Sequence, residues 1–540
     1  MSVEKKRFGK IRRLAATTIV GTSICLAGMA QASTNHWGAC GKADRWLSGD
    51  FHQHTYYTDG STTFDFVMEK NNAFGLDWWA NSEHGGRRNR DGEGDSWLDT
   101  SKYPENPILG DNSESGYMYR WQSLRDFVYP DILENRSLYS GKKIFSGFEW
   151  NVPAHEHCSV AVVSESMGPL AISAFEYQFD RSDNDTSRTG EWTPFGVLEK
   201  QNNTHEDTVA ACAWMQDQYQ KGMIDNAWII FAHIERAEAY QIEHFRDFNN
   251  AAPDICFGFE GAPGHQVNGK RGFGRNPGEA YGGAFGGVGS FTAQVGGLWD
   301  ALLGEGRHWF NYANSDYHQH WTAGGSDFYP GEYQRTWVNA IDFDRDGEFS
   351  LNEIADGLRS GNAYFVHGDL INALEFSAQG FLAKAVMGQD MHIRNHSWKK
   401  PVKITIKFKS PETNNNGDHP VVDHIDLIAG RITGKIDPQS PDYGKATNDT
   451  TKVMATFTQN DWQVDGEGYN VITYWIDNLE ASTYFRLRGT NLAVNTAYET
   501  DAEGNPLSDF LATDNLGLDG ADEAWADLWF YSNPIFVHVD

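Results

Sequence analysis

The sequence predicts an α/β layer or barrel over residues 33–370, followed by a smaller all-β sandwich over residues 371–540. In the first part, short apolar runs typical of buried strands alternate with longer segments that fit helices, and such alternation indicates an α/β architecture. Two runs that fit strands lie at 143–148 and 228–232, and two segments that fit helices lie at 64–72 and 208–221.

Past residue 370 the pattern changes to strands without helices. Residues 402–409 alternate apolar and polar side chains with a period of two, which is typical of a half-buried strand. Polar, turn-rich stretches separate further short strands of this kind, at 424–428, 453–458, 469–476, 484–488 and 535–539. Short strands in such a series indicate a β-sandwich.

The composition is that of an acidic, folded protein. The 540 residues carry a formal charge of −30, and 22% are charged, 40% hydrophobic and 14% aromatic, which is too apolar for a disordered chain. A chain this acidic repels the phosphate backbone of nucleic acids, so we expect no nucleic-acid partner. After the first 32 residues no apolar run approaches the ~20 residues that span a bilayer, so we expect no stable membrane insertion.

Residues 1–32 have the pattern of a cleavable signal peptide. Basic residues gather between Lys5 and Arg13, an apolar stretch follows to Met29, and Ala30-Gln31-Ala32 offers a small-x-small cleavage site. We therefore expect export to the periplasm or the extracellular space. In an oxidising compartment the four remaining cysteines permit two disulfides of undecided pairing, and free buried thiols are the alternative. These cysteines are Cys40, Cys158, Cys212 and Cys256.

Three His-x-His pairs lie within or just past strand-like runs, namely His52/His54, His155/His157 and His318/His320. Side chains i and i+2 of a strand face the same side, so both imidazoles of a pair can converge on one metal ion. Further candidate ligands at predicted strand ends are Asp59, His84, Glu149, His233 and Asp316. Together they describe the mouth of a barrel that holds a polynuclear metal site. Five histidines lack such a context: His36, His205, His244, His265 and His308.

The order of these motifs resembles the polymerase and histidinol phosphatase (PHP) superfamily of metal-dependent phosphoesterases. Its first motif, a strand followed by His-x-His and an acidic residue, is similar to the stretch from Gly49 to Gly60. Its second motif is similar to Ser82-Glu83-His84, with Glu83 in place of the usual Asp. The third resembles Gly147-Phe148-Glu149 followed by His157, with His155 as the competitor. The remaining motifs resemble the strand-end His233 and Asp316-Tyr317-His318, so the resemblance covers residues 46–370.

This resemblance implies a distorted (β/α)7 barrel of the PHP type with two or three divalent ions at its C-terminal face. The implied ligands are His52, His54, Asp59, His84, Glu149, His157, His233, Asp316 and His318, with Glu149 as the bridging carboxylate. The leader and the C-terminal strands further resemble an exported branch of the superfamily.

The implied activity is hydrolysis of a small phosphate ester. Bound metal ions lower the pKa of water from about 15.7 to about 7 and neutralise charge on a phosphoryl oxygen. Imidazole and carboxylate ligands suit Mn²⁺, Zn²⁺ or Fe²⁺. Arg87 and Arg236 follow two of the implied ligands and are placed to clamp a phosphate. The predicted catalytic residues are Glu149, Asp316, His84, Arg87 and Arg236.

A second metal signal lies at residues 342–353, which fit the twelve-residue EF-hand calcium loop. Gly347 stands where that loop turns sharply, and the segment before the loop fits a strand, so we expect an isolated Ca²⁺ loop with a structural role. The expected oxygen ligands come from Asp342, Asp344, Asp346, the backbone of Glu348, Ser350 and a bidentate Glu353.

Two other functions fit the same residues. Metal-activated water can attack a non-phosphate bond, such as an amide or a phosphonate, because the ions act in the same way. A non-catalytic, calcium-dependent surface protein that binds glycans is the alternative from a different class. Metal analysis separates them, because an enzyme of this kind needs transition metal in addition to calcium.

Overall fold

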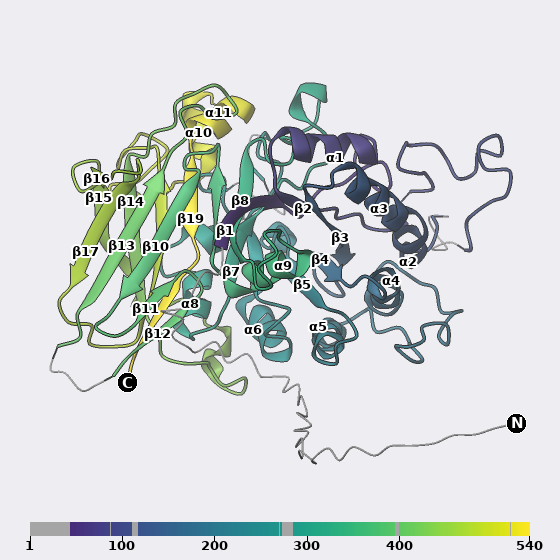
Figure 1. The fold of residues 1–540 in the computed structure, drawn as a ribbon, viewed down its shortest axis with the longest axis horizontal. Coiled ribbons are helices and arrows are strands. Elements are labelled where there is room, and N and C mark those ends of the chain that lie inside the picture. Colours follow the sequence, from purple (N-terminus) through teal and green to yellow (C-terminus); the bar gives the residue numbers. More distant parts are fainter. Residues whose placement is uncertain are drawn as a thin grey trace, which may run out of the picture. The chain divides into compact units, whose positions relative to one another are not determined.

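A mixed sheet of fifteen strands is the main element of this computed structural model (Figure 1). The structure describes residues 44–86, 88–110, 117–268, 271–272, 284–394, 399–518 and 520–540. The predicted signal peptide, Cys40 and Arg87 lie outside these ranges. Among the described helices, none is both long and apolar enough to cross a membrane.

The first seven strands carry most of the predicted site residues at their ends. They are β1 (Asp44–Asp50), β2 (Trp78–Ala80), β3 (Lys143–Asn151), β4 (His157–Val163), β5 (Asn226–Phe231), β6 (Gly258–Ala262) and β7 (Phe310–Ala313). β1, β2 and β3 run parallel, as do β5, β6 and β7, but β4 is antiparallel to both β3 and β5. The predicted alternation of strand and helix is therefore broken by a β3–β4 hairpin, and the first residue of β4 lies beside the C-terminal ends of its neighbours.

Helices connect most of these strands. They include α1 (Phe64–Ala73), α3 (Tyr129–Leu138), α4 (Gly168–Phe179), α5 (His205–Gln220), α6 (Ile242–Ala251) and α8 (Leu298–Gly304), with the shorter α2 (Arg120–Ser123) and α7 (Ser290–Ala293). Thr63 and Thr204 cap α1 and α5 by accepting backbone N–H groups on their hydroxyls, which satisfies otherwise unpaired donors. The two helices and two strands predicted at 64–72, 208–221, 143–148 and 228–232 are confirmed.

The end of β1 and the loop after β7 are joined by hydrogen bonds, although the two strands are not neighbours in the sheet. The Phe51 N–H donates to Asn314 Oδ1 at 2.8 Å, and the Ser315 N–H donates to Asp50 Oδ2 at 2.7 Å. The His54 N–H donates to the Tyr317 carbonyl, also at 2.8 Å. These bonds bring the site residues that follow β1 and β7 together.

Aromatic side chains fill the interior below the strand ends. Phe51 lies 5.7 Å from Trp228 and 6.1 Å from Trp78, measured between ring centroids. Phe145 lies 4.8 Å from Trp228 and 5.9 Å from Trp78, and all four rings are buried. Rings packed at these distances and mutual tilts contribute more than their buried area alone. They form a rigid base for the groups above them.

The C-terminal strands form two sheets that share one hydrophobic core. Ile406 of β13, Leu427 of β14 and Leu487 of β18 belong to the same buried cluster. One sheet has the order β11 (Lys384–Val386), β10 (Ala373–Gln379), β13 (Val402–Lys409), β17 (Asn470–Ile476) and β16 (Gln463–Val464). The other strands, which extend the long sheet, are β12 (Asp390–Ile393), β14 (His424–Arg431), β15 (Lys452–Thr458), β18 (Thr483–Thr490), β19 (Trp529–Ser532) and β20 (Ile535–Val539).

The long sheet continues across residue 370. β19 pairs with β9 (Ala363–His367), which pairs with β8 (Gln334–Ile341), and β8 pairs with β1. A buried ion pair also connects the two parts, because the Arg486 guanidinium donates to both oxygens of Asp300 in α8, at 2.8 and 2.7 Å.

The expectation that no helix follows residue 370 is wrong. Two short helices, α10 (Asp509–Leu516) and α11 (Gly520–Ala526), precede β19. The period-two alternation of strands is missing from this segment. Ser508 stands at the N-cap of α10, and Gly517 ends the helix in the left-handed conformation that glycine adopts readily.

Replacing Phe145 with alanine should lower the free energy of unfolding by about 3–5 kcal/mol, because it removes a ring from a closely packed aromatic cluster. Chemical denaturation monitored by circular dichroism measures this change. Phe381, which is 92% exposed, provides the control, and Phe381→Ala should change the stability by less than about 0.5 kcal/mol. Equal effects of the two substitutions would contradict this description of the core.

Candidate metal centre

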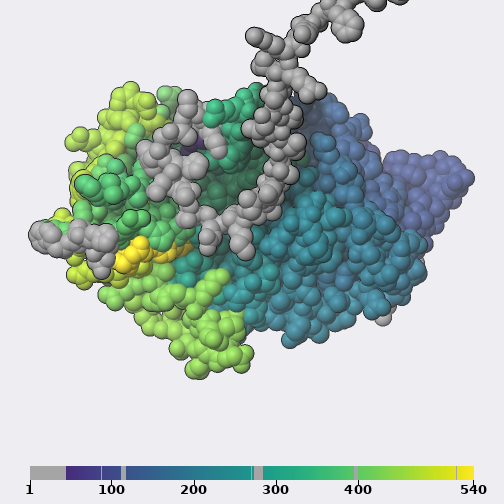
Figure 2. Space-filling model, turned by 60° about the horizontal axis from the view of Figure 1, so that its bottom comes forward, coloured from purple at the N-terminus to yellow at the C-terminus, as the bar shows by residue number. Residues whose placement is uncertain are grey.

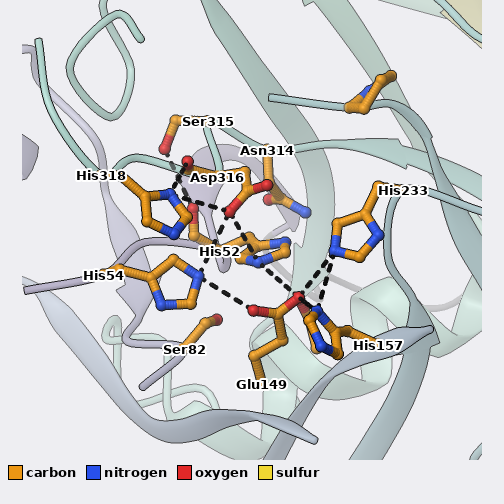
Figure 3. A network of polar contacts seen from close by, with 12 residues as sticks. His52, His54, Ser82, Glu149, His157, His233, Asn314, Ser315, Asp316 and His318 are labelled. Atoms are coloured by element: carbon orange, nitrogen blue, oxygen red, sulfur yellow. Dashed lines mark hydrogen bonds and ion pairs between the residues drawn. The ribbon is translucent and has the colours of Figure 1, made fainter. Parts of the chain in front are cut away.

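Histidines and carboxylates from all seven strand ends converge on one largely buried cluster, and Figure 3 labels those that come from β1, β3, β4, β5 and β7. His52, His54 and Asp59 follow β1, His84 follows β2, Glu149 lies in β3, His157 begins β4, His233 follows β5, His265 follows β6, and Asp316 and His318 follow β7. The structure thus brings together all nine ligands that the family resemblance implies. His157 joins the cluster from the start of its strand because β4 is reversed.

Glu149 is at the centre of this cluster and is 1% exposed. Its Oε1 lies 2.9 Å from His157 Nδ1, 3.0 Å from His233 Nε2 and 3.3 Å from His52 Nε2, and its Oε2 lies 3.0 Å from His84 Nε2 and 3.1 Å from His54 Nε2. Burial alone would raise the pKa of Glu149, but the surrounding imidazoles hold this pKa well below its ordinary value. The carboxylate is therefore ionised.

Asp316 faces the same histidines from the other side. Its Oδ1 lies 3.1 Å from His52 Nε2 and 3.3 Å from His54 Nε2, and its Oδ2 lies 3.1 Å from His265 Nε2. His52 Nε2, His54 Nε2 and Asp316 Oδ1 are buried and lack hydrogen bonds with good geometry, despite these short distances. Donor atoms that approach one another without pointing at one another fit a shared cation between them.

The ligand atoms fall into overlapping groups, each small enough to hold one ion. His52, His54, Glu149 and Asp316 form one group, and within each group the candidate ligand atoms lie within 4.8 Å of one another. Further groups include His84 with Glu149 and His157, His54 with Asp59 and His318, and Glu156 with His157 and His233. Glu149 and His54 each belong to two of these groups, so neighbouring groups share candidate ligands.

Two carboxylates that are not in the predicted set orient ligands of the cluster. Glu260 in β6 lies 2.9 Å from His52 Nδ1 and accepts a hydrogen bond from the Ser159 hydroxyl at 2.6 Å. Asp327 lies 2.5 Å from His265 Nδ1. Each carboxylate fixes the proton on one ring nitrogen and leaves the other nitrogen to face the cluster, as in many metal sites.

The expectation that His265 lacks a ligand-like context is wrong, because this ring lies between Asp316 and Asp327. It follows β6 by three residues, which is the same strand-end placement that identified His233. Gly264 makes this approach possible, because a Cβ there would lie 2.2 Å from the Ser315 carbonyl oxygen. The position of His265 just after a strand was the signal in the sequence that could have identified it. Glu260 and Asp327 belong to no recognisable motif, so no such signal marks them in the sequence.

Three residues of the cluster have backbone conformations that are rare outside glycine. The φ angles are 29° at His233, 60° at His265 and 45° at Asp316. Such conformations cost about 1–3 kcal/mol each and persist where the surrounding structure enforces them, commonly at functional sites. Here they turn side chains at three strand ends inward.

Two of the predicted His-x-His pairs do not act as pairs. His155 lies in the β3–β4 turn, where Ala154 has a φ of 61°, so the same-side rule for strands does not apply and only His157 reaches Glu149. His320 Nε2 is hydrogen-bonded to Glu332 Oε2 at 3.0 Å and its ring stacks on Tyr329, so it does not pair with His318. Glu83 accepts hydrogen bonds from the Thr55 and Thr58 hydroxyls and so supports the loop after β1.

Of the two arginines predicted to bind phosphate, the structure describes Arg236 but not Arg87. Arg236 begins the short 3-10 helix after β5, and its N–H donates to the His233 carbonyl at 2.9 Å. Its Nε lies 3.9 Å from Glu156 Oε2, at the edge of the cluster. Arg87 lies outside the described residues, so its role stays a prediction.

Of the four cysteines left after the leader, the three in the described part of the chain are free and buried: Cys158, Cys212 and Cys256. Two disulfides among the four are therefore excluded in this structure.

Neither a known family model nor a curated protein matches this chain. Among solved structures, the chain is similar to a two-domain protein from Bacteroides vulgatus that contains a predicted PHP-like metal-dependent phosphoesterase. The identity is 13% and the TM-score is 0.33, over 86% of this chain and 94% of the other.

Metal binding at this cluster should release protons. The neighbouring carboxylates overcome the effect of burial and raise the pKa of His54 to about 10, so this ring is charged at neutral pH in the metal-free protein. A metal ligand must be neutral, so the affinity for Zn²⁺ should rise by about tenfold per pH unit for each proton released between about pH 6 and 8.

Calorimetric titrations in buffers of different ionisation enthalpy count these protons. His419→Gln, at an exposed position outside the cluster, should leave the count unchanged. An affinity independent of pH over this range would contradict the expected charge of His54.

Proposed function

We propose that this chain is an exported, metal-dependent hydrolase that acts on small phosphate esters. The observation that carries the proposal is the environment of Glu149, whose two oxygens lie within 3.3 Å of nitrogens from five histidines. A carboxylate with imidazoles facing both oxygens is suited to bridge two divalent ions. The phosphate-ester substrate is supported by the order of the sequence motifs.

The donor set fits Mn²⁺, Zn²⁺ or Fe²⁺, because imidazole nitrogens outnumber carboxylate oxygens. Ions bound there would supply an activated water and neutralise charge on a substrate oxygen. Glu149, His52, His54 and Asp316 would hold them, while Glu260 and Asp327 keep the rings of His52 and His265 in the orientation that presents Nε2. Arg236 places a positive charge beside His233, where it can bind a phosphoryl oxygen.

The proposal includes the finer architecture. The strand segment β1–β7, joined at its ends by the contacts of Asp50 and Asn314, is consistent with a distorted (β/α)7 barrel in which β4 is reversed. The shared core of the two C-terminal sheets supports a β-sandwich over residues 371–540. Export to the periplasm or the extracellular space rests on the leader sequence.

Glu149→Gln should lower turnover on the order of 10²-fold or more, because it removes the charge that holds the ions in place. A panel of phosphate monoesters, diesters, a phosphonate and an amide, assayed with Mn²⁺, Zn²⁺ and Fe²⁺, provides the measurement. Elemental analysis of the same samples gives the metal content.

Glu176→Gln is the matched control. Glu176 is also buried, but burial raises its pKa well above the ordinary value, so glutamine replaces a carboxyl group that is already neutral. Turnover should stay unchanged in this variant. A Glu149→Gln protein with full turnover and full metal content would refute the proposal. Cleavage of only the amide or phosphonate would favour the second enzyme class, and calcium without transition metal would favour a binding protein.

We further propose that residues 342–353 bind Ca²⁺ in a structural role. The loop runs from the end of β8 into the first turn of α9 (Leu351–Ser360). Asp342 accepts the N–H groups of Arg345 at 2.5 Å and Gly347 at 3.1 Å, and Gly347 has a φ of 87°. Glu353 accepts N–H groups from both ends of the loop, so the two carboxylates at its first and last positions are held in place.

Glu353→Gln should lower the melting temperature in excess calcium, because an ion that binds only the folded state stabilises that state. Glu348→Gln is the control, since Glu348 would bind through its backbone carbonyl and its side chain is 73% exposed. Differential scanning calorimetry with calcium and with a calcium-selective chelator measures both variants. Equal melting temperatures of the unmodified protein under the two conditions would exclude the ion.

A further inference from the structure

A second histidine cluster lies apart from the residues around Glu149. It consists of His155 in the β3–β4 turn, His205 at the start of α5 and His244 in the first turn of α6, with candidate ligand atoms within 4.8 Å of one another. α5 and α6 lie side by side in Figure 1. Figure 2 brings the bottom of that view forward and shows this part of the chain, in teal, at the surface. His155 is buried, and the other two rings are partly exposed.

Hydrogen bonds determine which nitrogens of the first two rings carry protons. His155 Nδ1 lies 2.8 Å from the Ala239 carbonyl oxygen, so it must donate. His205 Nε2 lies 3.1 Å from Asp247 Oδ2 and donates to that carboxylate. In the neutral rings the remaining nitrogens, His155 Nε2 and His205 Nδ1, each present a lone pair.

These two lone pairs face each other at 3.0 Å. At that distance two acceptors repel, so the rings either share a proton in an N–H···N hydrogen bond or hold a metal ion between them. Two nitrogens bound to one tetrahedral Zn²⁺ at about 2.0–2.1 Å would be roughly 3.3 Å apart, which is close to the observed separation. Asp247 accepts the Nε2–H of His205 and leaves Nδ1 free to bind an ion. Histidines that bind metals in proteins are commonly oriented by a carboxylate in this way.

Asp247 is itself held from a distant part of the chain. The Tyr443 hydroxyl donates to Asp247 Oδ1 at 2.6 Å, which leaves Oδ2 for His205. His155 stacks on Tyr240 with 5.0 Å between ring centroids and an interplanar angle of 12°, so this ring is also fixed. Both facing nitrogens are therefore preorganised.

We propose that His155, His205 and His244 form a second transition-metal site, of the kind that takes Zn²⁺, Cu²⁺ or Ni²⁺. Three imidazoles without a carboxylate ligand favour these ions over Mg²⁺ and Ca²⁺. His244 is the weakest of the three ligands, because its Nδ1 accepts the Gln241 N–H at 3.0 Å and this bond must break when the ring binds an ion. The site would fasten the β3–β4 turn to the first turns of α5 and α6.

The test compares zinc binding by metal-depleted full-length proteins, using calorimetry and elemental analysis. The unmodified protein should bind one equivalent more than His205→Gln, and Glu149→Gln should keep that equivalent. His244→Gln should weaken it less than His205→Gln does. The control is His419→Gln, which removes an exposed histidine outside both clusters and should bind as the unmodified protein does.

Asp247→Asn keeps all three imidazoles, so it tests the site even if His205→Gln fails to fold. It should weaken the additional equivalent by about 10- to 100-fold while circular dichroism stays unchanged. Cobalt substitution gives an independent signal, because His205→Gln should lose one tetrahedral Co²⁺ absorption spectrum that Glu149→Gln retains. Equal zinc stoichiometry and affinity in the unmodified protein, His205→Gln and Asp247→Asn would overturn the proposal, and so would loss of every equivalent in Glu149→Gln.

Discussion

The ionised Glu149 carboxylate is the constraint on which the arrangement around it depends. A carboxylate removed from water is costly unless positive charge and hydrogen-bond donors replace the solvent. Five imidazoles meet this need, and Asp316 shares His52 and His54 with Glu149. These imidazoles come from four different strand ends, with His52 and His54 both after β1, so the neutralisation of this one group requires the strands to end at a common centre. Divalent ions bound at the cluster would supply the positive charge that the buried carboxylate needs, and the histidine rings would then carry fewer protons.

The rest of the fold keeps these groups in place against their own preferences. The positive φ angles at His233, His265 and Asp316 cost free energy, and hydrogen bonds to neighbouring segments offset it. Near Asp316, the buried Asp50 carboxyl group accepts the N–H groups of His52 and of Ser315, the residue before Asp316, and burial raises the pKa of Asp50 to about 7. The aromatic base below adds a packed surface that cannot deform easily. These contacts hold the site residues together without requiring an ion.

The sequence predicted most of this cluster because strand-end histidines and carboxylates leave a local pattern. It could not predict the groups that act through tertiary contacts, such as Glu260 on His52 and Asp327 on His265, since no spacing links them to their partners. The period-two rule located the His52/His54 pair but was wrong for His155 and His157, because a left-handed residue at Ala154 places the first of them in a turn. The reversal of β4 also escaped prediction, since a hairpin and a crossover can join similar apolar runs.

The same turn explains how two histidines separated by one residue can face different clusters. His157 begins β4 and directs Nδ1 to Glu149, whereas His155, two residues earlier, directs Nε2 to His205. An ion at the second cluster would have no direct contact with the first. Any effect on the first cluster would pass through Tyr240 and the backbone. The ring of His155 stacks on the ring of Tyr240, and the hydroxyl of Tyr240 donates to the His157 carbonyl, which also accepts the Ala232 N–H. Because Tyr240 contacts both histidines, fixing His155 also restricts the start of β4. It thereby restricts the position of His157, one of the imidazoles that face Glu149.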